Sequence, residues 1–106
     1  MSDDKKQISC GAIVFNEHNK FLIIKPTGNS QYWNIPKGLL EKNESPRECM
    51  YREVFEETNI RLESMRGGKI YRYGRYNYLK NKDLILYSVR FDYTPNNLKL
   101  KCNSFF

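Results

Sequence analysis

The stretch that decides the fold is YREVFEETNI, residues 51–60. Its acidic residues Glu53, Glu56 and Glu57 are spaced i, i+3 and i+4, so on a helix the three carboxylates share one face. Like charges at this spacing destabilise an isolated helix by a few tenths of a kcal/mol per pair. Hard divalent cations, in contrast, prefer oxygen ligands. The cluster therefore predicts a Mg²⁺ or Mn²⁺ site, and the alternative is a solvated acidic surface.

Both ends of this helix are marked in the sequence. Ser45 is a good N-cap, Pro46 fits the first helical position, and Glu48 completes a Ser-x-x-Glu capping box. Asn59 tolerates the left-handed conformation that often ends helices. The spacing predicts a helix from Pro46 to Thr58. The face expected to pack on a sheet carries Met50, Tyr51, Val54 and Thr58.

The helix and the loop before it resemble the Nudix box, G-x5-E-x7-R-E-U-x-E-E-x-G-U, in which U is aliphatic. Val54 and Ile60 occupy the two aliphatic positions. At ordinary residue frequencies, six fixed matches at one register arise by chance with a probability on the order of 10⁻⁷. Asn59 stands where the family has Gly, and we expect it to cost a little stability and no chemistry. The six matched positions are Gly38, Glu44, Arg52, Glu53, Glu56 and Glu57.

The resemblance implies an α/β (mixed α+β) fold: a Nudix-type mixed β-sheet with the box loop-helix-loop on one face. The family normally continues to a C-terminal helix on the other face, and this helix is expected to be absent. We therefore expect residues 1–106 to form a single Nudix-like domain, truncated at the C-terminus. One sheet face would then lie exposed, either covered by a homo-oligomer partner or left open because the chain is part of a longer protein.

Four further segments predict strands. Residues 8–15 and 21–25 are expected to form one hairpin, with Gly11 allowing close backbone approach. Residues 69–78 and 84–93 are expected to form a second hairpin around a turn at Asn81-Lys82. A further strand is expected to begin within residues 98–102.

The implied activity is metal-dependent hydrolysis of a phosphoanhydride in a nucleoside diphosphate-linked substrate. The general base is either Glu53 or a residue on a segment that this chain lacks, since no Glu follows Glu63. Arg52 would orient the carboxylates, and Glu44 would support the metal shell or only favour the helix dipole. The implied metal ligands are Glu53, Glu56, Glu57 and the backbone carbonyl of Gly38.

Residues outside the box bear on the substrate. Residues 33–38, WNIPKG, are similar to the W-x-x-P-K-G segment of diadenosine-polyphosphate hydrolases, and YRYGRYNY, residues 71–78, is similar to their substrate-binding hairpin. Tyrosine rings stack well on bases, although a strand can also bury its tyrosines in the core. The favoured reaction is asymmetrical cleavage of a dinucleoside tetraphosphate to NTP plus NMP. The candidate substrate-binding residues are Trp33, Lys37, Tyr76, Tyr78, Lys80 and Lys82.

Two alternatives stay open. One is an RNA 5′-end pyrophosphohydrolase or decapping enzyme, because a net charge of +6 and a pI of about 9.3 favour anionic partners such as nucleotides or RNA. RNA binding across several phosphates would weaken steeply with salt. The other is a weakly active nucleotide-binding or oligomerising module.

The length of the chain and its cysteines limit which classes of protein it can belong to. The 106 residues suffice for one compact domain. Cys10, Cys49 and Cys102 form neither a disulfide framework nor a zinc motif, which predicts reduced thiols and a cytoplasmic location. We expect no membrane partner, because no apolar run approaches membrane-spanning length.

Overall fold

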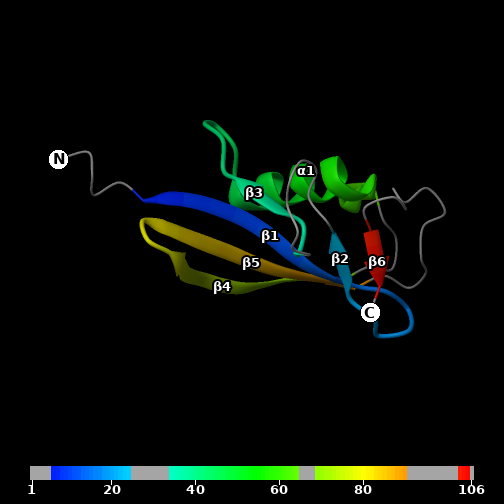
Figure 1. Ribbon diagram of the computed structural model, residues 1–106. Coiled ribbons are helices and arrows are strands. Elements are labelled where there is room, and N and C mark those ends of the chain that lie inside the picture. Colours follow the sequence, from blue (N-terminus) through cyan, green and yellow to red (C-terminus); the bar gives the residue numbers. More distant parts are fainter. Residues whose placement is uncertain (1–5, 25–33, 65–68, 91–102, 106) are drawn as a thin grey trace.

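The computed structural model describes residues 6–24, 34–64, 69–90 and 103–105. The strands and helices follow one another as in Figure 1. Among the described residues, no helix is long and apolar enough to cross a membrane. The elements are β1 (Gln7–Phe15), β2 (Leu22–Ile24), β3 (Lys37–Leu39), α1 (Pro46–Thr58), the 3₁₀ turn η2 (Leu62–Ser64), β4 (Lys69–Leu79), β5 (Lys82–Arg90) and β6 (Asn103–Phe105).

A four-stranded mixed sheet organises the molecule, in the order β3-β1-β5-β4. β1 and β5 are parallel, and the other neighbours are antiparallel. Helix α1 lies across one face of this sheet (Figure 1). The period-2 alternation of strands turns one set of side chains toward α1, and these form the core with Met50 and Val54 of the helix. The predicted mixed sheet with the box helix on one face is confirmed. The core residues of β1 and β5 are Cys10, Ala12, Val14, Ile85, Tyr87 and Val89.

The opposite face of the sheet, here called the outer face, carries the alternate residues of the same strands. On β4, Tyr71 pairs with Ser88 and Tyr76 pairs with Leu84, so both tyrosines lie on this face. Both rings are exposed. The half-buried apolar side chains of this face are Ile13, Phe15, Leu84 and Leu86.

The predicted hairpin of β4 and β5 is confirmed, with its turn at Lys80-Asn81 rather than Asn81-Lys82. Asn81 takes the left-handed conformation there, at φ 59°. Two irregularities interrupt the pairing, between Arg72 and Gly74 and between Asn77 and Leu79. A bulge shifts the alternation of side chains by one residue. Strict alternation therefore fails along β4, and Tyr76 and Tyr78 do not share one environment.

The predicted first hairpin is wrong. Phe21, just before β2, makes an isolated bridge to Phe15 of β1. β2 itself pairs antiparallel with β6 and bridges Asn34 through Ile24. β5 occupies one edge of β1 along its whole length, and β3 occupies the other edge from Ser9 to Gly11. Lys25 and residues 91–102, which include part of the predicted strands, lie outside the described residues.

The predicted ends of α1 are confirmed. Ser45 Oγ accepts from the backbone N–H of Glu48 at 3.1 Å, and Glu48 Oε1 accepts from the Ser45 N–H at 2.9 Å. Asn59 closes the helix at φ 68°, and its N–H bonds the carbonyl of Phe55. Met50, Val54 and Thr58 are buried as predicted, Tyr51 is half-buried, and Cys49 is buried in addition.

Substituting Asn59 with Gly is expected to raise the free energy of unfolding by at most about 1 kcal/mol, because Gly adopts positive φ without the cost of a Cβ. Turnover should not change. Chemical denaturation and steady-state kinetics on the same preparation check both statements. A large change in kcat with an unchanged melting temperature would contradict the structural role given to Asn59.

Asp83 is expected to affect how steeply the free energy of unfolding falls as the pH is lowered. Arg75 Nε donates to its Oδ2 at 2.8 Å, and Lys6 Nζ lies 3.4 Å from Oδ1. The Arg75 hydrogen bond holds the pKa of Asp83 below its usual 3.8. A depressed carboxyl pKa gives stability that is present above the unfolded pKa and lost as pH falls through the folded value. In Arg75→Gln, unfolding midpoints measured between about pH 5 and pH 2 should fall less steeply with acid than in the parent. An unaltered slope would show that this pair does not contribute.

Candidate active site

The acidic side of α1 rests against β3, which the sheet holds close beneath the helix. β3 pairs with β1 through Gly11 opposite Lys37 and Cys10 opposite Gly38. A Cβ at Gly11 would meet Lys37 Cβ at 2.5 Å and the carbonyl oxygen of Pro36 at 2.7 Å. The predicted close approach at Gly11 is therefore confirmed, and it brings Lys37 and Gly38 under the carboxylates.

Gly38 and Glu53 fit together because Gly38 has no side chain. A Cβ at Gly38 would collide with the carboxylate of Glu53. The carbonyl oxygen of Gly38 also accepts a weak hydrogen bond from the Cys49 thiol, at 3.7 Å. The glycine thus places a carboxylate directly against the backbone of β3.

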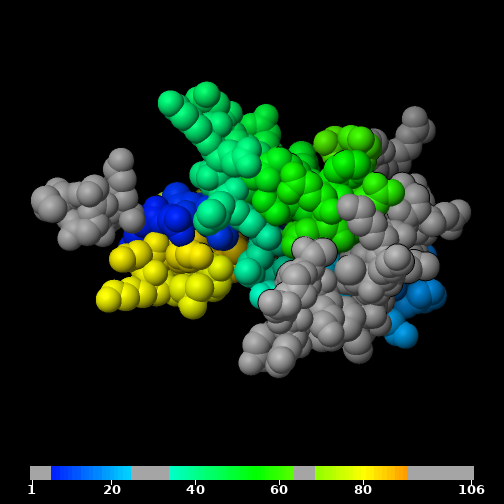
Figure 2. Space-filling view, turned by 45° about the horizontal axis from the view of Figure 1, so that its top comes forward, coloured from blue at the N-terminus to red at the C-terminus, as the bar shows by residue number. Residues whose placement is uncertain are grey.

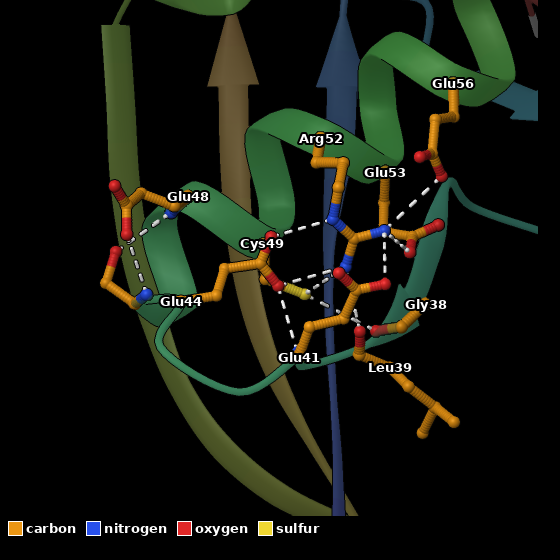
Figure 3. Close-up of polar contacts among 10 residues, drawn as sticks. Gly38, Leu39, Glu41, Glu44, Glu48, Cys49, Arg52, Glu53 and Glu56 are labelled. Atoms are coloured by element: carbon orange, nitrogen blue, oxygen red, sulfur yellow. Dashed lines mark hydrogen bonds and ion pairs between the residues drawn. The ribbon is translucent and has the colours of Figure 1, made fainter.

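Arg52 is the centre of the polar network (Figure 3). It binds Glu44 through two parallel contacts, Nε to Oε2 at 2.7 Å and Nη2 to Oε1 at 3.0 Å. Its Nη1 donates to Glu53 Oε2 at 2.8 Å and, more weakly, to Glu56 Oε1 at 3.4 Å. Its Nη2 also donates to the carbonyl of Leu39 at 3.0 Å. Arg52 thus contacts both Glu44 and Glu53, and its role in orienting the carboxylates for catalysis stays a prediction.

The carboxyl groups differ in the direction of their pKa shifts. The hydrogen bond from Arg52 lowers the pKa of Glu44 to about 2, and the same contact raises the pKa of Arg52. Burial raises the pKa of Glu53, against the opposing effect of Arg52. Burial and then the charge of Glu53 raise the pKa of Glu57 to about 7, although Glu57 Oε2 accepts from the Lys37 N–H at 3.0 Å. Glu53 and Glu57 are therefore neighbouring half-buried carboxylates whose negative charges are costly to keep together.

These properties fit a divalent cation in part. Carboxylate and carbonyl oxygens are the donors that hard cations take, and a cation would relieve the repulsion between Glu53 and Glu57. Glu56 lies apart, with 55% of its side chain exposed and its carboxylate directed to Arg52 (Figure 3). Across the described ranges, no three His, Cys, Asp or Glu side chains are arranged to hold a metal. The full ligand set of Gly38, Glu53, Glu56 and Glu57 stays a prediction.

The candidate substrate-binding residues separate into groups. Lys37 Nζ lies over the ring of Tyr78, 5.3 Å from its centroid. Lys37 pairs with Gly11, which pairs in turn with Leu86, so the Lys37 side chain lies on the outer face, and only its backbone N–H reaches the carboxylates. Tyr76 lies on the outer face, opposite Leu84. Lys80 and Lys82 lie at the tip of the hairpin, the yellow end in Figure 2. Trp33 lies outside the described residues.

Several contacts of the site were not predicted from the sequence. The Leu39 carbonyl and Glu41, whose Oε2 lies 3.8 Å from Arg52 Nη1, both belong to the Arg52 network. A backbone carbonyl leaves no sequence signal. The thiols of Cys10 and Cys49 are both buried in the core. The alternation of β1 and the helical period of α1 together placed both cysteines in the core, so this pair was open to prediction.

The comparisons agree with this geometry. The family model described as "NUDIX domain" matches residues 5–103. The chain belongs to the Nudix family. A MutT-like protein of Streptomyces ambofaciens is 39% identical over 56 residues, which cover 53% of this Nudix chain and 36% of that protein. An RNA pyrophosphohydrolase of Hamiltonella defensa is 34% identical over 67 residues, covering 62% and 40% of the two chains. The chain thus matches less than half the length of these relatives.

Solved Nudix structures share the fold. The MutT protein of Methanosarcina mazei superposes with a TM-score of 0.65 at 31% identity, covering 91% of this chain and 70% of that one. A C. elegans Ap4A hydrolase superposes with a TM-score of 0.71 at 18% identity, covering 92% and 77%. At that identity the second likeness speaks for the fold alone. The box of this chain therefore lies in the same fold as the box of other Nudix proteins.

Proposed function

We propose that this chain is a metal-dependent pyrophosphohydrolase, which cleaves a phosphoanhydride in a substrate containing a nucleoside diphosphate. The observation that carries the proposal is the pair of half-buried carboxylates, Glu53 and Glu57, held together against β3 with raised pKa values. A structural ion pair needs only one acid beside one base, so it does not explain two neighbouring half-buried carboxylates. A site that binds a divalent cation and a water activated by it does require several carboxylates close together.

The residues would divide the work as follows. Glu53, Glu57 and the Gly38 carbonyl would hold Mg²⁺ or Mn²⁺, with Glu56 completing the set. The metal would neutralise phosphate charge and lower the pKa of a bound water. Glu53 would take the proton of the attacking water, and its raised pKa suits a base. Arg52 fixes the orientation of Glu53 through Oε2 and is itself fixed by Glu44.

For the substrate, our first proposal is a dinucleoside tetraphosphate, cleaved asymmetrically to NTP plus NMP. Lys37 supports it, because its ammonium group lies over the ring of Tyr78 and brings a cation and an aromatic ring together next to the box residue Gly38. We expect this cation to contact a phosphate of the substrate. Tyr78 would hold the Lys37 ammonium group in place and would also stack on a nucleobase of the substrate.

A second candidate is the 5′ end of RNA. It is favoured by the relative named RNA pyrophosphohydrolase and by the net charge of +6. A third outcome, a binding module with little turnover, follows if Glu53 cannot serve as base in this chain.

A substrate panel separates these candidates. Diadenosine tetraphosphate, 5′-triphosphorylated RNA, ADP-ribose and NTPs are incubated with Mg²⁺ and with Mn²⁺, and products are separated by ion-exchange chromatography. We expect ATP and AMP from diadenosine tetraphosphate. Release of pyrophosphate from RNA, with an apparent affinity that falls steeply with salt, would select the second candidate. Binding of ATP without any product would reject the enzymatic proposal.

We further propose that a second copy of the chain covers part of the outer face. The half-buried Leu84 and Leu86 lie there beside the exposed ring of Tyr76. Leu84→Lys should shift the protein toward monomer in light scattering after size exclusion. A parent protein that is monomeric over the whole accessible concentration range would end this proposal.

A further inference from the structure

We propose that the outer face carries a second binding site, for a nucleoside phosphate. A cavity of about 420 Å³ opens on this face, within the size range of small-molecule sites. We call it the outer-face pocket. Its lining residues are Phe15, Lys69, Tyr71, Tyr73, Ser88 and Arg90.

The sheet register explains why these residues meet. Phe15 of β1 pairs with Arg90 of β5, and Arg90 pairs in turn with Lys69 of β4. The next outer-face pair along the hairpin is Tyr71 with Ser88. The pocket thus spans three strands at one end of the sheet. Helix α1 and the carboxylates lie on the other face, so the sheet itself separates the pocket from the candidate active site.

The charge of the pocket favours an anion. Lys69 and Arg90 are directly opposite each other, and like charges in this position destabilise a strand pair. Arg90 lies over the ring of Phe15, 5.0 Å from its centroid, and its Nη1 donates to Asn19 Oδ1. Neither contact supplies a negative charge. Among the described residues, the lining includes no carboxylate, so a bound phosphate would offset the repulsion between the two cations.

The aromatic part of the lining favours a base beside that phosphate. Tyr71 and Tyr73 are 59% and 56% exposed, which is unusual for large rings and leaves their surfaces open for stacking. Ser88 adds a hydroxyl next to them. Together these groups suit a nucleoside phosphate: the rings would stack on the base, the two cations would bind the phosphate, and the hydroxyl would form a hydrogen bond. The unit can come from a free nucleotide or from a single-stranded oligonucleotide.

The test is a binding titration of the full chain in EDTA, which withholds divalent metal from the box. The probes are AMP, adenosine, inorganic phosphate and pentaadenylate. Isothermal titration calorimetry measures the affinity of each probe. The variants are Lys69→Gln, Arg90→Gln and Tyr71→Ala, with circular dichroism to confirm the fold. The matched control is Arg61→Gln, which removes one positive charge and one cation over an aromatic ring, Phe55, away from the pocket.

We expect AMP to bind more tightly than adenosine or phosphate. Each pocket variant should weaken AMP about tenfold, in line with the loss of one stacking or charged contact, and Arg61→Gln should leave it unchanged. Tighter binding of pentaadenylate than of AMP would identify an oligonucleotide as the source of the unit, and equal binding a free nucleotide. Equal losses in Arg61→Gln and Lys69→Gln, or no binding of any probe in EDTA, would overturn the proposal. Neither result bears on hydrolysis at the box, which is measured with metal present.

Discussion

Glu53→Gln is expected to lower kcat by about 10²–10⁴-fold while the protein stays folded. Glutamine keeps the volume of the side chain against Gly38, where a Cβ would have no room. It removes the negative charge that would bind the metal and the basic oxygen that would accept a proton from water. The measurement is steady-state hydrolysis of diadenosine tetraphosphate at saturating metal, with the melting temperature recorded in parallel.

The control for this experiment is Glu63→Gln. Glu63 lies in η2 and is exposed, so this change also removes one carboxylate without touching the box. Full activity in Glu53→Gln would exclude Glu53 as the base. A loss of activity shared with Glu63→Gln would point to net charge rather than to chemistry.

Arg52→Met is expected to destabilise the protein by about 2–3 kcal/mol and to abolish activity. Glu44 and Glu53 are each only 13% exposed in their side chains, and both would lose a charge-assisted partner. The carbonyl of Leu39 would lose a donor as well. The neighbouring carboxylates would then repel one another with nothing to hold their positions. Urea denaturation and the substrate assay measure the two effects.

Two further variants separate charge from geometry. Arg52→Lys keeps the charge but cannot reproduce two parallel contacts to Glu44 together with contacts to Glu53 and Leu39, so it should recover little activity. Arg47→Met removes an arginine from the same helix that bonds Tyr51 at the surface, and should change stability by less than about 0.5 kcal/mol. If Arg52→Lys behaved like the parent protein, only the positive charge would matter, and the network described above would be incidental.

Local sequence signals predicted the helix well because its ends are decided by neighbouring residues. The capping box and the left-handed Asn59 act within a few positions, and short-range chemistry can be read directly. The pairing of β2 was not predicted, because it depends on which strands occupy the edges of β1. One of those strands, β5, lies far along the chain. Long-range competition of this kind has no local signature.

The candidate site divides in the same way. The positions of Gly38, Glu44, Arg52 and Glu53 follow from motif spacing, and the structure brings them into one network. The hairpin residues did not follow, because two bulges change which face each tyrosine occupies. The irregularity between Arg72 and Gly74 puts Tyr76 on the same outer face as Tyr71, although strict alternation would place them on opposite faces. Tyr78 contacts Lys37, which its pairing with Gly11 places on that face too.

The parallel pairing of β1 with β5 has a consequence for synthesis. Gln7 pairs with Lys82 and Phe15 with Arg90, so β1 acquires this neighbour only after residues 82–90 have left the ribosome. Such distant contacts slow folding. During translation α1 can form its turns early, but β1, the strand that holds β3 beneath the carboxylates, stays unpaired on its other edge until β5 is made. We expect the nascent chain to depend on chaperones at this stage, and amide exchange in β3 to become slow only when β5 has docked.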